Sequence, residues 1–169
     1  WHYARGIAFA EKKDKASALA EAAAIRKILQ DTDWSTLDAW GIPVRPILEV
    51  AQAVVQARVA QAEGDNAGAI GQWQKAAEAE DAIPYMEPPF WYYPVRQSLG
   101  AALLKAGKPD EAQAEFRAAL DSARGSPWAL YGLQQAAKAK GDAEAEGRAA
   151  SELSKAWRGD PAQLSLERL

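Results

Sequence analysis

The side chain best suited to acid–base chemistry in this sequence is His2, the single histidine of the chain. A serine or threonine nucleophile needs such a base within hydrogen-bond reach. No serine has a plausible local histidine partner, and no Gly-x-Ser-x-Gly turn occurs. The chain has no cysteine, which excludes a thiol nucleophile and a disulfide. We therefore interpret His2 as a helix residue that packs or hydrogen-bonds near its neighbours, and we expect no catalytic residues and no enzymatic activity.

Two further segments could hold a phosphate or a metal ion. The glycine-rich stretch GDNAGAIG (64–71) lacks the Lys-Ser or Lys-Thr of a phosphate-binding loop and follows a helical pattern instead of a strand. Its first residue, Gly64, is better explained as a helix terminator. The acidic stretch EAEDAIPYME (78–87) spaces its carboxylates less regularly than calcium-binding loops do. We interpret it as solvated charge, and we expect no cofactor and no metal site.

Composition excludes several classes of partner. The net charge of −3 supplies no basic surface for nucleic acid or for an acidic membrane. No run approaches the roughly 18 apolar residues of a spanning helix, so no membrane insertion is expected. Alanine dominates the hydrophobic share, which favours closely packed helices. Since cysteine-free chains occur in both the cytoplasm and the periplasm, composition leaves the compartment open.

Prolines and aromatic residues crowd together between residues 87 and 94, in EPPFWYYP. Proline fixes φ and biases the preceding residue away from the helical region, so we expect residues 87–93, which we call the strap, to be extended and stiff. Phe90, Trp91 and Tyr92 either pack over the seam between two repeats or line the rim of a groove, and packing is favoured for the cluster as a whole. Arg96 would meet an anionic or carbonyl group of a ligand in the second case. In the first, we expect it to pair with Glu80, Asp81 or Glu87.

The second half of the chain has an internal period. Gly107 and Gly141 end similar helical stretches 34 residues apart, and Gly64 ends a third one 43 residues before Gly107. The longer interval equals one period plus an insertion of nine residues, where IPYMEPPFW lies. A period of about 34 residues made of two helices is typical of tetratricopeptide repeats.

The repeat centred on Gly107 shows the pattern most clearly. Leu99 and Gly100 precede Gly107, and Ala112 and Phe116 follow it with the Ala-x-x-x-Phe spacing of a second helix. We expect Phe116 to be buried between neighbouring helix pairs. Trp73 is its equivalent one repeat earlier, and the final repeat is irregular, with Glu146 and Ala150 at these positions. Terminal repeats are commonly atypical.

The run EPPFWYYPVRQSLGAALLKAG (87–107) resembles the C-terminal region of a poorly characterised family of bacterial tetratricopeptide-repeat proteins. WHYARG (1–6) and AWRGD (156–160) are also similar to segments of that family. The resemblance implies that the chain is the C-terminal part of a longer, exported protein. The resemblance does not indicate an activity. The histidine-rich segments of the family lie upstream, so any metal-binding role that they have is not transferred to these residues.

These patterns together predict an all-α fold, a right-handed superhelix of antiparallel helix pairs. We expect a single array over residues 1–169, with pairs at about 1–29, 44–80, 91–123 and 127–157. The segment 31–43 should be a loop with a short helix around Thr36–Trp40. Residues 160–169 should form one short helix or turn that covers the last pair, because the apolar end of an array must be shielded.

The predicted function is a non-enzymatic module that binds a protein or an extended peptide in a concave groove. A structural cap for a binding or metal site further upstream is the alternative. The sequence does not fix the oligomeric state. The first helix of each pair should line the groove, together with the strap, and the candidate ligand-binding residues are Tyr3, Arg58, Tyr92, Arg96, Gln97, Lys105, Tyr131, Gln135 and Lys138.

Overall fold

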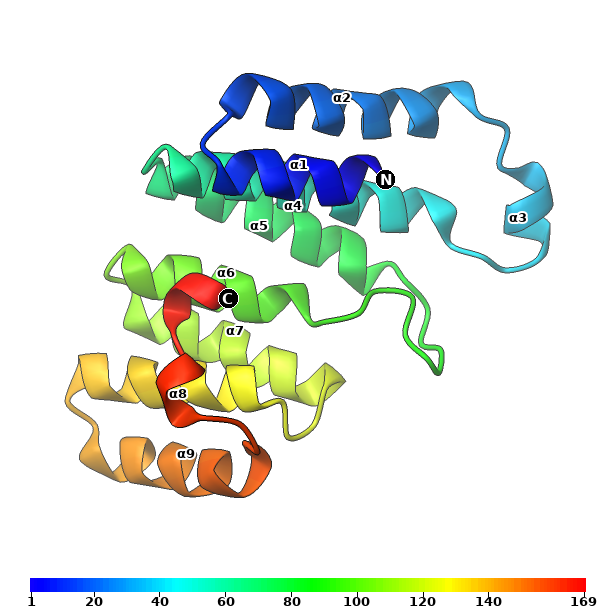
Figure 1. Ribbon diagram of the computed structural model, residues 1–169. Coiled ribbons are helices and arrows are strands. Elements are labelled where there is room, and N and C mark those ends of the chain that lie inside the picture. The colour runs from blue at the N-terminus through cyan, green and yellow to red at the C-terminus, as the bar shows by residue number, and fades with distance from the viewer. The chain divides into compact units, whose positions relative to one another are not determined.

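The computed structural model describes all residues from 1 to 169 and contains helices and turns but no strand, so the expected all-α class is confirmed (Figure 1). A short helix in the first long connection, expected around Thr36–Trp40, is also confirmed, as α3. None of the helices combines the length and the hydropathy that a membrane-spanning segment requires. The elements are α1 (His2–Glu11), α2 (Lys15–Asp31), α3 (Ser35–Ala39), α4 (Val44–Ala62), α5 (Asn66–Asp81), α6 (Val95–Lys105), α7 (Pro109–Ser122), α8 (Pro127–Lys140), α9 (Ala143–Ala156) and the short turns η1 (Pro161–Gln163) and η2 (Leu166–Arg168).

The chain folds as two compact units, Trp1–Tyr92 and Tyr93–Leu169. The first unit contains the hairpins α1–α2 and α4–α5, and α4 packs against both helices of the first hairpin. The second unit contains the hairpins α6–α7 and α8–α9, with α7 packed against α8. Each unit is thus two stacked helix pairs. The single array over residues 1–169 stays a prediction.

Short turns join the two helices of each pair, and they reuse the same backbone device. Gly64, Gly107 and Gly141 have φ of 74°, 76° and 71°, a region that glycine enters without a steric penalty. Lys13 takes this place in the first pair with φ 60°. Two residues later the next helix begins, and an aspartate side chain accepts a hydrogen bond from its first turn in three of the four pairs: Asp14, Asp65 and Asp142. In the remaining pair, Lys108 precedes Pro109 at the first helical position.

The core of the second unit is organised around Phe116, which is fully buried as expected. Its ring lies against the backbone of α6 and of α8, because a Cβ placed on Gly100 would come within 2.8 Å of it and one on Gly132 within 2.2 Å. Ala112 and Ala119 are also fully buried on the same face of α7. The predicted position of Phe116 between neighbouring helix pairs is therefore confirmed.

In the first unit the core lies around α4. Val50, Val54 and Val55 on this helix are almost completely buried, and so is Trp73 on α5, as predicted. A Cβ placed on Gly6 would lie 2.8 Å from a methyl group of Val55, so α1 and α4 meet at van der Waals distance there. The close approach is possible because Gly6 on α1 has no side chain at the point where Val55 of α4 meets it.

Two details differ from the sequence predictions, the start of the third pair and the backbone of the strap. The third pair begins at Val95, four residues after the expected start, because the residue before Pro94 is biased away from the helical region. In α9, which the sequence already marks as irregular, the buried residues are Ala149 and Leu153, and Glu146 and Ala150 are half-buried. The strap is not extended: the backbone bends at residues 87–88 and 90–93.

The bends of the strap return its aromatic rings to the first helix. Trp91 is only 8% exposed, and its ring meets that of Tyr3 on α1 edge to face at 5.3 Å between centroids. Tyr85, by contrast, lies almost fully in solvent and donates a hydrogen bond to Glu87 at 2.6 Å. The expected burial of Trp91 is confirmed, while its packing over the seam between repeats stays a prediction.

Candidate functional site

The segment that follows α9, residues 157–169, which we call the tail, makes contacts on the first helices of the second unit. Figure 1 shows it leaving α9, crossing α8 and ending beside α6. The segment therefore lies on the last pair and, through its last leucine, also reaches the preceding pair. Its backbone is not α-helical; two short 3-10 turns, η1 and η2, alternate with extended residues.

Leu169 and Ser98 anchor the tail on α6. The Leu169 side chain is buried, with 3% exposure, and Ser98 is completely buried. The Ser98 hydroxyl donates a hydrogen bond to the carbonyl oxygen of Leu169. A buried hydroxyl needs such a partner, because desolvating it without a hydrogen bond is unfavourable. Ser98 thus places a buried hydroxyl on α6, and the tail supplies its hydrogen-bond acceptor.

Two aromatic residues of α8, Trp128 and Tyr131, lie close to opposite ends of the tail. Trp157, at the beginning of the tail, packs edge to face on Trp128 with centroids 5.5 Å apart. Gly159 lets the chain turn tightly around this ring, since a Cβ there would lie 2.9 Å from it. Further along, Tyr131 has a raised pKa, first because burial disfavours its charged form and second because the carboxylate of Glu167 is near. The tail therefore contacts both α6 and α8 through side chains of different chemistry.

Of the nine candidate ligand-binding residues, six lie in the second unit, and they differ in exposure. Tyr131 and Gln135 on α8 are half-buried, and Lys105 and Lys138 are exposed. Gln97 is buried, with 7% exposure, and its amide oxygen accepts a hydrogen bond from Ser126.

Arg96, the sixth of these residues, makes a hydrogen-bonded ion pair with Glu115 on α7, with Nη1 and Oε2 2.7 Å apart. Glu115 was not among the acids considered from the sequence. The pairing of Arg96 with Glu80, Asp81 or Glu87 stays a prediction.

The other three candidates lie in the first unit. The hydroxyls of Tyr3 and Tyr92 form a hydrogen bond with the oxygens 2.7 Å apart, and Tyr92 is 70% exposed, so this pair lies at the solvent-exposed surface. Arg58 lies elsewhere on α4, with its guanidinium over the ring of Trp73 at 5.1 Å and a hydrogen bond to Gln61 at 3.3 Å. The structure brings Tyr3 and Tyr92 together and gives Arg58 a packing partner in the core.

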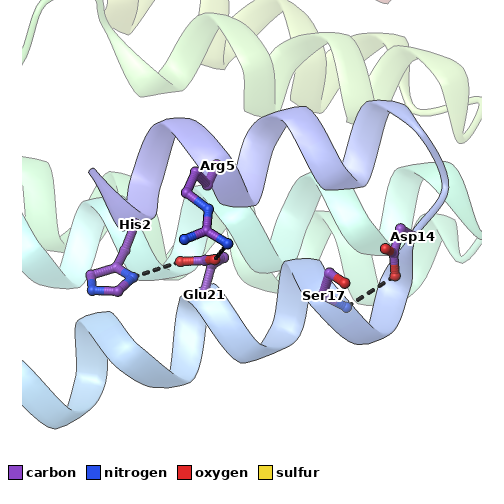
Figure 2. Close-up of polar contacts among 5 residues, drawn as sticks. All are labelled: His2, Arg5, Asp14, Ser17 and Glu21. Atoms are coloured by element: carbon purple, nitrogen blue, oxygen red, sulfur yellow. Dashed lines mark hydrogen bonds and ion pairs between the residues drawn. The ribbon is translucent and has the colours of Figure 1, made fainter.

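His2 takes part in a polar cluster that the sequence did not indicate. Figure 2 shows its imidazole and the Arg5 guanidinium converging from α1 on Glu21 of α2. His2 Nδ1 donates to one carboxylate oxygen at 2.6 Å, and Arg5 Nη2 meets the other at 3.0 Å. The Glu21 side chain is only 9% exposed. Because both oxygens of this carboxylate are engaged, the cluster ties α1 to α2, much as the Asp14–Ser17 contact in the same figure fixes the start of α2.

A polar groove of about 500 Å³ lies between α2, α4 and α5 in the first unit. Its lining includes three glutamines, Gln52 and Gln56 from α4 and Gln72 from α5, together with charged side chains of both signs. None of the nine candidate residues lines this groove. The structure contains no group of three or more histidine, cysteine, aspartate or glutamate side chains arranged to hold a metal ion.

Comparison with known proteins does not assign a family. No family model matches the chain, and no curated protein matches it significantly.

Proposed function

We propose that the chain is a non-enzymatic module that binds an extended protein segment on the first helices of its pairs, and that the pairs form a right-handed tetratricopeptide-like superhelix. The helix pairs within each unit, the positive φ of Gly64, Gly107 and Gly141, and the place of Phe116 between two glycines support the repeat architecture. So does the resemblance of residues 87–107 to bacterial repeat proteins.

The observation that carries the proposed binding role is the tail on α6 and α8. This face already accommodates a chain segment that is not α-helical, through one hydrogen bond to its backbone and burial of Leu169. A surface that binds an extended segment of its own chain has the shape and the polarity to bind one from another protein. Half-buried Tyr131 and Gln135 and exposed Lys105 would supply the polar contacts.

The test is a pull-down with the protein as bait, comparing Lys105→Ala and Tyr131→Ala with the matched control Lys155→Ala on α9. Partners lost by both first variants and kept by the control support the proposal. Partners that all three variants retain at the wild-type level contradict it.

A structural cap, which closes the array for a binding or metal site elsewhere in a longer protein, is the second candidate. The coverage of α8 and α6 by the tail favours it, because part of the surface that a partner would use is already occupied. A longer protein that binds its partners equally with and without the Tyr131→Ala change, and loses them when segments outside residues 1–169 are removed, would favour the cap.

A further inference from the structure

The tail is held by a few separate contacts along its length. Leu169 is the buried residue among positions 160–169, whereas Leu164, Ser165 and Leu166 are half-buried and the others are exposed. A segment with so little buried apolar area has a small free energy of docking, because hydrophobic stabilisation is roughly proportional to the area removed from water. Such a segment can leave its surface while the helices beneath it stay folded.

The contacts also define what kind of chain the surface selects. Ser98 recognises a backbone carbonyl, which every peptide offers, so the side chains around it must provide selectivity. In the tail these are the leucines at 164, 166 and 169, of which Leu169 is buried and the other two are half-buried. The pattern is Leu-x-Leu-x-x-Leu. Its spacing by two and by three matches the mixture of extended and 3-10 backbone that the tail adopts.

We propose that the face of α6 and α8 is a docking site for a leucine-bearing extended segment of another protein, and that the tail is its competitor within the same chain. The inference rests on the proposed binding function and adds the chemistry of the partner and its regulation. A partner segment gains access when the tail leaves. While docked, the tail competes at an effective concentration on the order of millimolar, as a short tether provides.

Fluorescence anisotropy with a labelled peptide of residues 157–169 tests this inference. The full chain is compared with a variant in which Leu166→Asp and Leu169→Asp weaken the tail but leave the face unchanged. We expect the variant to bind the peptide at least about 10-fold more tightly than the wild type, because the internal competitor is removed. A labelled peptide that carries the same two aspartates should bind neither protein.

Ser98→Ala in the weakened-tail background identifies the site. It removes the hydroxyl that contacts the Leu169 carbonyl and should weaken peptide binding, whereas the matched control Ser122→Ala on α7 should not. If the double aspartate variant loses its far-ultraviolet helical signal, the milder Leu166→Ala replaces it. Its expected gain in affinity is smaller but has the same direction.

Three results of the peptide experiment would overturn the inference: equal peptide affinity for the wild type and the weakened-tail variant, no binding to a folded weakened-tail variant, or binding that Ser98→Ala does not change.

A fourth result, from a measurement of oligomeric state, would also overturn it. If the wild type forms concentration-dependent dimers that disappear in the weakened-tail variant, the tail binds a second copy of the chain. The proposed function would stand after any of these results if partners in the pull-down are still lost in the Lys105→Ala and Tyr131→Ala variants. If the peptide binds as expected but both variants keep their pull-down partners, the proposed function is rejected instead.

Discussion

In the unit of residues 93–169, an aromatic ring from the second helix of one pair fills the space next to two glycines: Phe116 lies against Gly100 and Gly132. In the unit of residues 1–92, the position equivalent to Phe116 is Ala22, nine residues after Lys13 as Phe116 is nine after Gly107. Val55, the equivalent of Gly132, fills the space instead and lies against Gly6.

The equivalent space is therefore filled from different helices in the two units: from the second helix of the earlier pair by Phe116, and from the first helix of the later pair by Val55. A large residue on the second helix requires glycine on the next pair, and a small one permits valine there. In both units the space between neighbouring helix pairs is filled, but the side chain that fills it comes from a different helix. Close packing makes this compensation necessary, because interiors leave few voids larger than a water molecule.

Truncation of Phe116 should have the largest effect. Phe116→Ala leaves a cavity between three helices, and we expect it to lower the free energy of unfolding by about 3–5 kcal/mol, measured by urea denaturation. Adding Gly132→Val to this variant reproduces the arrangement of the first unit. It should restore about 1–2 kcal/mol, as coupled neighbours do. Gly132→Val alone should destabilise the wild type. If Gly132→Val lowers the free energy of unfolding of the Phe116→Ala variant further, the comparison is refuted.

Crowding the glycine of the first unit should have the next largest effect. In Gly6→Ala the new methyl group would lie 2.8 Å from Val55, so one helix must shift, at a cost of about 1–3 kcal/mol. The control is Gly71→Ala on α5, where nothing lies within 4 Å of the added carbon. There the gain in helix propensity should stabilise the protein by up to about 1 kcal/mol. Equal effects of the two substitutions in thermal unfolding would contradict the close approach of α1 and α4.

The start of the second helix in each pair gives a smaller, pH-dependent contrast. Hydrogen bonds from the Ser17 side chain and then from its backbone N–H lower the pKa of Asp14 below the usual 3.8. A lowered pKa in the folded state means that this stabilisation is present above the pKa of the unfolded chain and is lost as the pH falls through the folded pKa. Asp14→Ala should therefore lower the melting temperature at neutral pH, and the difference from wild type should shrink in acid.

Lys108→Asp introduces the same cap at the start of α7, the one second helix that lacks it, and should raise the melting temperature at neutral pH. A wild type and an Asp14→Ala variant with parallel melting curves at every pH would show that the cap carries no charge-dependent stability.

Replacing Lys13 should have the smallest effect. Its φ of 60° costs an L-residue about 1–2 kcal/mol, which glycine avoids, although glycine also loses more backbone entropy on folding. We expect Lys13→Gly to stabilise the protein by about 0.5–1 kcal/mol in urea denaturation. The reverse change, Gly107→Ala, should destabilise it by a similar amount. Destabilisation by Lys13→Gly would mean that the lysine side chain contributes more than its backbone costs.

The sequence predicted those parts of the structure that depend on local or periodic signals. Gly64, Gly107 and Gly141 mark helix ends because only a positive φ reverses the chain there, and the Ala-x-x-x-Phe spacing placed Phe116 in the core. Contacts at long range left no such signal. Ser98 reads as an ordinary small helix residue until the Leu169 carbonyl, 71 positions away, is placed beside it.

The irregular last repeat shows a second limit. One period after Ala112 and Phe116 the sequence has Glu146 and Ala150, and α9 instead buries Ala149 and Leu153. The period therefore marks this repeat as irregular but does not indicate which residues of α9 face α8.

The edge-to-face pair of Trp128 and Trp157 gives the protein a built-in optical reporter. Two indoles with centroids 5.5 Å apart and planes inclined at 74° couple their strong electronic transitions, which produces an exciton band in the far-ultraviolet circular-dichroism spectrum. One indole belongs to α8 and the other opens the tail, so the band should follow departure of the tail from Trp128 without any attached dye. Release of the tail then becomes an event that can be timed in the unlabelled protein.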